Sequence, residues 1–227
     1  MCIKRHLGEL GLCALVALTA CASEKLSSEP IDDPGSAVGP TVFAEPDSSV
    51  VSGSPDSGPR SRRSRPGPLF MVGDSVLAST DSFNTNSAEE IIGAAGWKLT
   101  IDAVKNRRTS EGRAAIEEHL DDLPDTIVIM LGHNDDPTTF ESDARQMLDL
   151  VEDVDTVYWL TMVEPRYVKA NRTLRRLQAT YPNLQLIDWA AKIKDSWVSD
   201  DGLHLTPIGS ENLTKVILTG LTAGLDR

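Results

Sequence analysis

Five short apolar runs recur in the chain from residue 67 onward. Each is rich in β-branched or other large aliphatic residues and is too short for a helix, which is typical of strands buried on both faces of a sheet. The expected strands are Leu69–Val72, Leu99–Ala103, Thr126–Leu131, Thr156–Met162 and Leu184–Ile187.

Between these runs, apolar residues recur every three or four positions, which predicts amphipathic helices. An alternation of strands and helices over 161 residues predicts one α/β domain, in which right-handed crossovers build a parallel sheet. We therefore expect a three-layer α/β/α sandwich with a five-stranded parallel sheet over residues 67–227. The expected helices are Ser87–Ala94, Ser110–Leu120, Phe140–Val151, Val168–Thr180 and Pro207–Leu221.

The first 66 residues lack this alternation and divide into two parts. Lys4 and Arg5 precede an apolar run, Leu10–Ala20, that is too short to span a membrane as a mature helix. Residues 1–20 are therefore interpreted as an export signal. Residues 21–66 are dense in Ser, Pro, Gly and Asp and are expected to form a disordered tether.

The junction of signal and tether, Leu18-Thr19-Ala20-Cys21, resembles a bacterial lipobox. The resemblance implies that Cys21 is diacylated and becomes the first residue after cleavage. A lipid on Cys21 would hold the protein on the outer side of the bacterial cell membrane. The alternative is an ordinary secretory signal that is cut near Ala20 or Ala22.

The positions of the cysteines and the net charge exclude several kinds of site and partner for the domain. The three cysteines all precede residue 67, which excludes a thiol nucleophile, a disulfide and a thiolate metal site from it. The histidines show no metal-binding spacing, and we expect neither a metal nor a cofactor. Residues 67–227 contain 15 Lys and Arg against 26 Asp and Glu, so nucleic acid is a poor candidate partner.

Four polar residues could carry out ester chemistry at one edge of the sheet. Ser75 follows the first strand and Asn134 the third, while Asp201 and His204 precede the last helix. Ligands of open parallel sheets bind beyond the carboxyl ends of the strands. Ser75 would be the nucleophile, His204 its base and Asp201 the carboxylate that orients the base. Asn134 would donate to the oxyanion. Simple capping and turn roles for Ser75 and Asn134 are the alternatives.

Residues beside these four have less specific expected roles. Asp74 is interpreted as a local hydrogen-bonding residue and His133 as a loop residue that lines the pocket. In the loop after the fourth strand, Arg166 or Tyr167 could contact a glycan or a carboxylate of the substrate.

Three motifs in chain order resemble the motif blocks of the SGNH subgroup of GDSL hydrolases. They are Gly73-Asp74-Ser75, Gly132-His133-Asn134-Asp135 and Asp201-Gly202-Leu203-His204. The resemblance runs from about Pro68 to the C-terminus and implies a flavodoxin-like fold. The family usually has a glycine after the second strand whose N–H joins the oxyanion hole, and Asn106 stands there in this sequence. Asparagine tolerates left-handed backbone angles, so Asn106 could still donate. Otherwise the hole has two donors, from the Ser75 N–H and Asn134, or the site is degenerate.

Three functions are compatible with this resemblance. One is an extracytoplasmic serine esterase that removes a small acyl group, such as acetyl, from an envelope glycan or a small ester. The same region also resembles SGNH domains associated with membrane acyltransferases that O-acetylate cell-wall glycans, which would require a separate membrane partner. The third is an inactive wall-binding lipoprotein that retains the fold. The joint presence of the four polar residues favours an enzyme.

Overall fold

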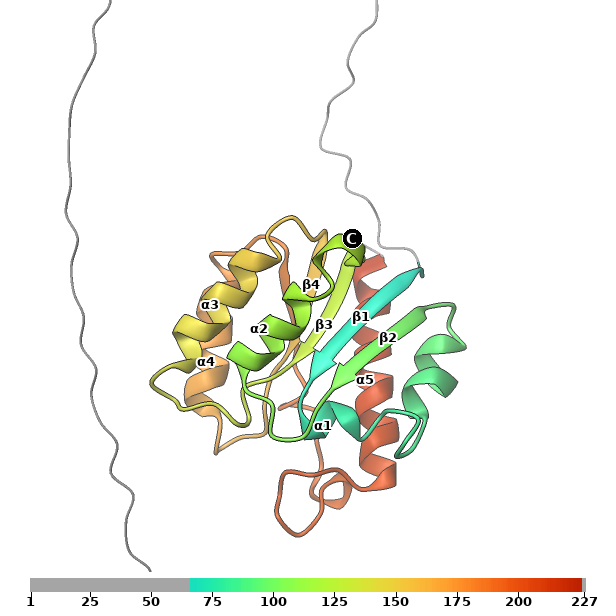
Figure 1. Ribbon diagram of the computed structural model, residues 1–227. Helices are drawn as coiled ribbons and strands as arrows, with labels where there is room; N and C mark the ends of the chain where they lie inside the picture. The colour runs from blue at the N-terminus through green and yellow to red at the C-terminus, as the bar shows by residue number, and fades with distance from the viewer. Residues whose placement is uncertain (1–65, 226–227) are drawn as a thin grey trace, which may run out of the picture. The chain divides into compact units, whose positions relative to one another are not determined.

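Five parallel strands form one sheet in the order β2-β1-β3-β4-β5 (Figure 1). The computed structural model describes residues 66–225, so the predicted signal, Cys21 and the tether up to residue 65 lie outside them. All five predicted strands and the α/β architecture are confirmed. The strands are β1 (Pro68–Gly73), β2 (Lys98–Ala103), β3 (Thr126–Met130), β4 (Thr156–Leu160) and β5 (Leu184–Ile187).

Helices connect the strands and close the domain. They are α1 (Ser75–Ala78), α2 (Thr109–Glu117), α3 (Phe140–Leu150), α4 (Val168–Gln178) and α5 (Pro207–Leu225). The predicted helix at 87–94 is present at residues 87–93, where its last five residues wind as the π-helical turn η1 (Glu89–Gly93). None of the helices within residues 66–225 combines the length and the apolarity needed to cross a membrane.

The short helix α1 was not expected as a separate element. Asp74 starts it, because its carboxylate accepts a hydrogen bond from the Val76 N–H at 2.9 Å and so caps the first turn. Gly73 allows the turn to pack tightly, since a Cβ at that position would lie 2.5 Å from the Cβ of Leu77. Ser75 is therefore the first residue of a helix that leaves the sheet abruptly after β1.

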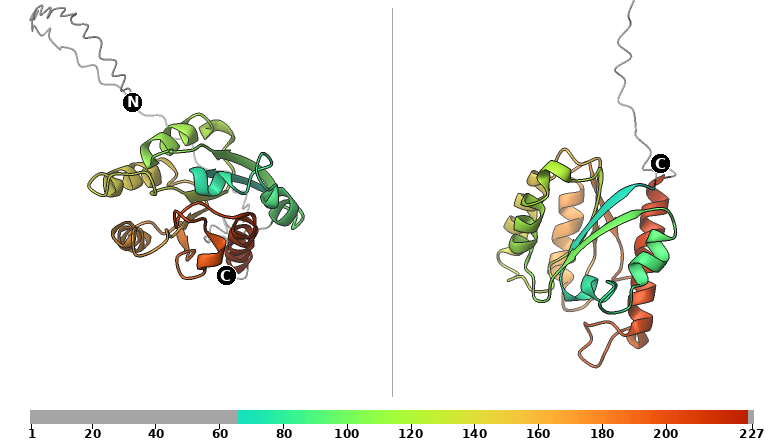
Figure 2. Two further views of the ribbon diagram at one scale, coloured as in Figure 1. Left: turned by 90° about the horizontal axis from the view of Figure 1, so that it is seen from below. Right: turned by 45° about the vertical axis from the view of Figure 1, so that its right-hand side comes forward.

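Alternate residues of the central strands face two separate cores. In β1, Phe70 and Val72 belong to a buried cluster that includes residues of α2, α3 and α4. Leu69 and Met71 belong to a second cluster that includes residues of α1, η1 and α5. Figure 2 shows the resulting layers, with α2, α3 and α4 covering one face of the sheet and α5 the other. The burial of both faces explains why the strands are apolar throughout.

Strand β4 ends two residues earlier than predicted, because the backbone of Met162 bonds to the side chain of Asn171 instead of to a neighbouring strand. The buried Asn171 of α4 accepts from the Met162 N–H at 2.8 Å and donates to the Met162 carbonyl at 2.7 Å. Both backbone groups of Met162 are thereby satisfied outside the sheet.

The carboxyl ends of the strands meet at the edge of the sheet where α1 lies (Figure 1). Strand β1 pairs with β2 on one side and with β3 on the other, so the strand order reverses at β1. This switch point is where ligands of doubly wound sheets bind. The loop after β3 contains Gly132, which has a φ of 120°. A Cβ at this position would lie 2.5 Å from the sulfur of Met162. Glycine is required at this turn.

Candidate active site

Ser75, His204 and Asp201 form a continuous chain of polar contacts at this edge. His204 Nε2 lies 3.1 Å from the hydroxyl oxygen of Ser75, and His204 Nδ1 lies 2.6 Å from Oδ2 of Asp201. With its proton on Nδ1, the imidazole donates to the carboxylate and leaves Nε2 free to accept from Ser75. The structure thus brings together three predicted residues from two distant segments of the chain.

Asp201 is held by the backbone of its own loop. Its Oδ1 accepts from the N–H groups of Leu203 and His204 at 2.9 and 3.0 Å, and from the hydroxyl of Ser199 at 3.0 Å. The hydrogen bond from the His204 side chain, followed by those from the two backbone N–H groups, holds the pKa of the Asp201 carboxyl well below its usual range. The carboxylate is therefore ionised and aimed at the histidine.

The loop that contains Asp201 and His204 folds back on itself. The Ser199 N–H donates to the His204 carbonyl at 2.7 Å, and Val198 pairs with Leu205 in an antiparallel bridge. At the base of the loop, the ring of Trp197 stacks on that of the fully buried Trp189, with centroids 5.9 Å apart. This anchoring gives the exposed histidine a defined position.

Asn134 lies in the loop after β3, and one hydrogen bond holds the nitrogen of its side-chain amide. Its Nδ2 donates to the carbonyl of Arg107 at 3.1 Å. The guanidinium of Arg107 is itself fixed, because it donates to the carbonyl and the carboxylate of Asp102 at 2.6 and 2.7 Å. An amide nitrogen has two hydrogens, so one N–H of Asn134 is left for a ligand.

Asn106 has the backbone conformation of a glycine. Its φ is 62°, within the left-handed region that most side chains avoid, and the residue is exposed in the turn between β2 and α2. Asparagine therefore does adopt left-handed angles at this position, as expected from the sequence. Its role as an oxyanion donor stays a prediction.

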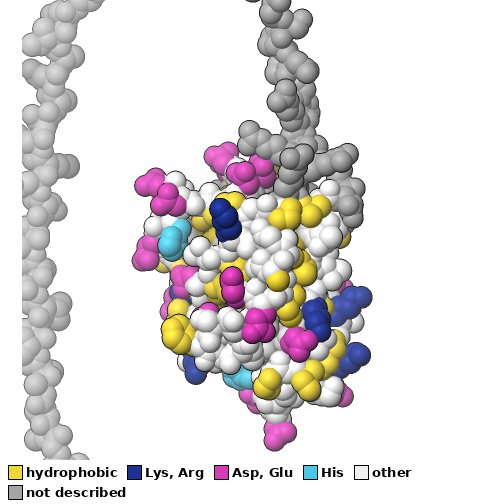
Figure 3. All heavy atoms as spheres, turned by 90° about the vertical axis from the view of Figure 1, so that its right-hand side faces the viewer, with side chains coloured by type: hydrophobic (Ala, Val, Ile, Leu, Met, Phe, Trp, Pro, Cys, Tyr) yellow, Lys and Arg dark blue, Asp and Glu magenta, His cyan; other side chains and the backbone are white. Residues whose placement is uncertain are grey.

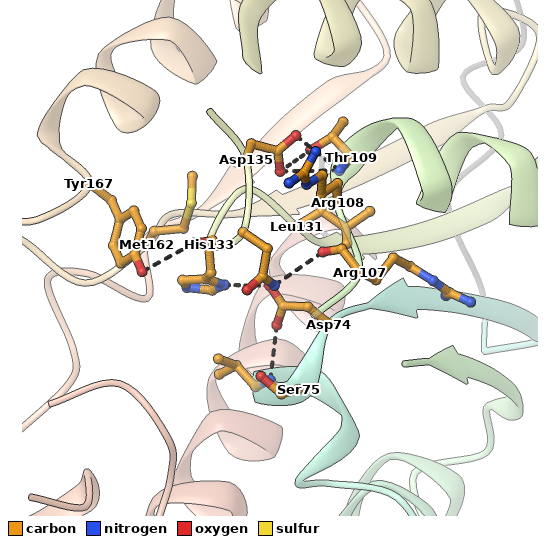
Figure 4. A network of polar contacts seen from close by, with 12 residues as sticks. Asp74, Ser75, Arg107, Arg108, Thr109, Leu131, His133, Asp135, Met162 and Tyr167 are labelled. Carbon is orange, nitrogen blue, oxygen red and sulfur yellow. Dashed lines mark hydrogen bonds and ion pairs between the residues drawn. The ribbon is translucent and has the colours of Figure 1, made fainter. Parts of the chain in front are cut away.

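Asp74 and His133 form a second histidine–carboxylate pair, which is buried. Oδ2 of Asp74 lies 2.7 Å from Nδ1 of His133, and their side chains are 0% and 1% exposed. Figure 4 shows the His133 ring between Asp74 and Tyr167. The prediction that His133 is a pocket-lining loop residue is therefore corrected, because Asp74 draws the ring into the interior. Asp74 forms the predicted local hydrogen bond in α1, and it also contacts His133 in the loop after the neighbouring strand β3.

Tyr167 faces the same loop, unlike Arg166. The hydroxyl of Tyr167 donates to the His133 carbonyl at 3.3 Å, and the two rings meet edge to face at 5.0 Å. Burial raises the pKa of the Tyr167 hydroxyl, so it is a donor at neutral pH. Arg166 is exposed and lies over the Tyr167 ring, at 5.4 Å from its centroid. Substrate contacts by these residues stay a prediction.

The neighbouring Asp135 ties the loop to α2. Its carboxylate accepts from the N–H and the hydroxyl of Thr109, at 3.1 and 3.0 Å (Figure 4). Burial raises the pKa of Asp135, although the bonds from Thr109 oppose this shift. Across the part of the chain that the structure describes, no cluster of three or more His, Cys, Asp or Glu side chains could hold a metal ion.

Sequence reasoning missed the supporting residues Ser199, Arg107 and the Asp74–His133 pair. One local signal was present, since a histidine directly precedes Asn134 and an aspartate directly precedes Ser75. Their pairing depends on the register of β1 and β3, which aligns Gly73 with Met130.

The sequence matches no family profile and no curated protein. Solved structures do share the fold. The C-terminal catalytic domain of Streptococcus pneumoniae peptidoglycan O-acetyltransferase A is 18% identical, with a TM-score of 0.58 over 71% of this chain and 96% of that one. A psychrotrophic esterase from Pseudoalteromonas is 12% identical, with a TM-score of 0.59 over 70% of this chain and 99% of that one.

A third structure of the same fold comes from Veillonella parvula and belongs to the lipolytic G-D-S-L family. It is 16% identical, with a TM-score of 0.56, and the match covers 69% of this chain and 98% of that one. The described domain therefore has the α/β fold found in SGNH/GDSL hydrolase structures. At these identities the likeness establishes the fold.

Proposed function

We propose that residues 67–227 form a serine ester hydrolase that acts on O-acyl groups through an acyl-enzyme. The observation that carries this proposal is the unbroken contact chain from the Ser75 hydroxyl through His204 to Asp201. A serine hydroxyl becomes a competent nucleophile only beside a base of the correct tautomer, and Asp201 imposes that tautomer on His204.

In the proposed reaction, His204 Nε2 takes the Ser75 proton as the serine oxygen attacks the ester carbonyl. The negative charge on the former carbonyl oxygen meets the free N–H of Asn134 and the backbone N–H of Ser75 at the start of α1. His204 then gives its proton to the departing alcohol oxygen, and Ser75 retains the acyl group. Water, deprotonated by His204, cleaves this second ester and restores the serine.

The exposure of the site supports a small acyl group on a bulky polar carrier. The side chains of His204 and Asp201 are 52% and 50% exposed, so a large carrier can approach the reacting bond from solvent. Acidic side chains are spread over the face of the domain shown in Figure 3, in keeping with its excess of acidic residues. A neutral or cationic glycan fits this charge better than nucleic acid does.

Acyl transfer is the second candidate, supported by the fold shared with the catalytic domain of peptidoglycan O-acetyltransferase A. The chemistry up to the acyl-enzyme would be identical. A sugar hydroxyl in place of water would then accept the acyl group, and a separate membrane acyltransferase would supply it. The inactive alternative rested on Asn106 at the position where the family usually has glycine, and the left-handed φ of 62° at Asn106 weighs against it, because asparagine adopts there the backbone angles that a glycine would allow.

The proposed setting is the outer side of the bacterial cell membrane. It rests on the sequence alone, through the export signal at residues 1–20 and the lipobox-like segment that ends in Cys21. A lipid on Cys21 and the tether over residues 21–66 would place the domain near envelope glycans.

The test of the ester chemistry compares the full chain with Ser75→Ala on a chromogenic acetyl ester. The variant should lose turnover and labelling by a fluorophosphonate while its circular dichroism is unchanged. Ser82→Ala, which alters an exposed serine in the loop after α1, is the matched control and should keep both. Unchanged turnover in Ser75→Ala would falsify the nucleophile assignment. Mass spectrometry of wall oligosaccharides mixed with an acetyl donor then separates acetyl loss from acetyl gain.

A further inference from the structure

The buried Asp74–His133 pair lies outside the proposed proton-transfer chain but directly precedes the proposed nucleophile and the proposed oxyanion donor in the sequence. Asp74 directly precedes Ser75, and His133 directly precedes Asn134. The 2.7 Å contact between Oδ2 of Asp74 and Nδ1 of His133 joins residues that are 59 positions apart. It thereby links the loop after β1, which presents the nucleophile, to the loop after β3, which presents the oxyanion donor.

Both partners are fixed by further contacts. Asp74 also accepts from the Val76 N–H at 2.9 Å, and its own N–H donates to the Met130 carbonyl at 3.2 Å. The carbonyl of His133 accepts from the Tyr167 hydroxyl at 3.3 Å. The pair is thus part of a connection between β1, β3 and the loop that precedes α4 (Figure 4).

Only one of the two ring nitrogens of His133 has a polar partner among residues 66–225. Among residues 66–225, its buried Nε2 has no hydrogen-bond partner, whereas Nδ1 faces the carboxylate of Asp74. A neutral ring with its proton on Nδ1 satisfies Asp74 and leaves only a lone pair unmet. Rotation of the ring away from Asp74 would leave the buried Oδ2 without its donor, while Oδ1 keeps the Val76 N–H, and a buried carboxylate oxygen without a donor is strongly unfavourable. One rotamer and one tautomer are therefore selected.

We propose that Asp74 and His133 are positioning residues that hold the Asn134 amide and the Ser75 N–H at a fixed separation for the oxyanion. This inference rests on the proposed ester chemistry. Asn134 is constrained at two points. Its amide donates to the Arg107 carbonyl at 3.1 Å, and its backbone follows directly on His133, whose ring and carbonyl are held by Asp74 and Tyr167. With either constraint released, the remaining N–H of Asn134 would lose its aim at the carbonyl oxygen, where a misplacement of about 1 Å can cost about 100-fold in rate.

A double-mutant cycle between positions 133 and 134 tests this role in the full chain, with a chromogenic acetyl ester as the probe. His133→Phe keeps an aromatic side chain, with a somewhat larger ring, but removes the donor to Asp74. It should lower kcat by about 10- to 100-fold with KM changed by less than about 3-fold. In the Asn134→Ala background the same substitution should change kcat by less than about 3-fold, because the donor that it positions is absent.

Three further variants complete the design. His133→Asn places an amide nitrogen where Nδ1 was and should recover most of the loss. His119→Asn changes an exposed histidine just after α2, outside the proposed site, and should leave kcat unaltered. If His133→Phe does not fold, Asp74→Asn takes its place. Its amide oxygen still caps Val76, but its N–H can bond Nδ1 only if the His133 proton moves to the buried Nε2, which has no acceptor among residues 66–225, so the contact is weakened.

The outcomes separate this inference from the proposed function. Loss of kcat that is equal in both backgrounds, or unchanged kcat in the folded variants, would overturn the positioning role while leaving the esterase intact. Absence of turnover in the unaltered chain would overturn both. Proton NMR gives a readout that does not need activity: the Nδ1–H of His133 should give a low-field resonance that exchanges slowly with water, survives in Ser75→Ala and disappears in His133→Phe.

Discussion

Replacement of Asp201 by asparagine should reverse the hydrogen-bond polarity of His204 without removing any heavy atom from the loop. Three donors converge on Oδ1 of Asp201, from Leu203, His204 and Ser199. The asparagine must keep its carbonyl oxygen toward these donors, so its amide N–H₂ faces His204 Nδ1. The imidazole then accepts on Nδ1 and carries its proton on Nε2, where it cannot take the Ser75 proton.

The expected loss in kcat for Asp201→Asn is about 10³- to 10⁴-fold, close to the loss seen for the same change in another serine triad. The lower figure reflects the half exposure of both side chains, which lets water stabilise the productive tautomer. Steady-state kinetics on an acetyl ester from about pH 5 to 9 measures the effect, a range in which a carboxyl with a lowered pKa stays ionised.

Asp200→Asn is the matched control, because it changes an adjacent exposed carboxylate and should keep kcat within about 2-fold. Thermal unfolding should be similar for both variants. If Asp201→Asn retained more than about one tenth of the wild-type kcat, the tautomer argument would fail and His204 would need no carboxylate partner.

Other predictions address the donor, the fold and the anchor. Asn134→Ala should lower kcat by about 10²- to 10³-fold yet still allow fluorophosphonate labelling of Ser75, whereas His204→Ala should abolish labelling. Gly132→Ala should destabilise the domain by about 2–4 kcal/mol in thermal unfolding, because it combines a positive φ with a clash against Met162. Gly202→Ala, which has a positive φ but open space around it, should cost about 1 kcal/mol. Cys21→Ala should release the protein from membranes into the soluble fraction. If the variant stays with the membranes, the lipobox interpretation is contradicted.

Local patterning was sufficient to predict the architecture. Apolar runs of strand length alternate with helical periodicity, and this alternation admits few topologies other than a parallel sheet between two layers of helices. The helical spacing at 87–94 correctly predicted a helix, but it did not predict that Glu89–Gly93 would wind as the π-helical turn η1. Ser75, Asn134, Asp201 and His204 could be singled out because each lies at the end of a strand or before a helix, where parallel sheets place their ligands.

The sequence by itself determined the fold class, the order of the elements and the four polar residues, because periodicity and motif spacing are properties of neighbouring residues. The motif spacing already favoured His204 as the base of Ser75, but only the tertiary structure decided where the His133 ring lies. His133 and His204 both adjoin motif residues, yet the register of β1 and β3 brings His133 beside Asp74, where it is buried, whereas the loop before α5 holds His204 exposed beside Ser75. Burial and pairing of this kind depend on contacts between segments far apart in the chain, which local patterns do not specify.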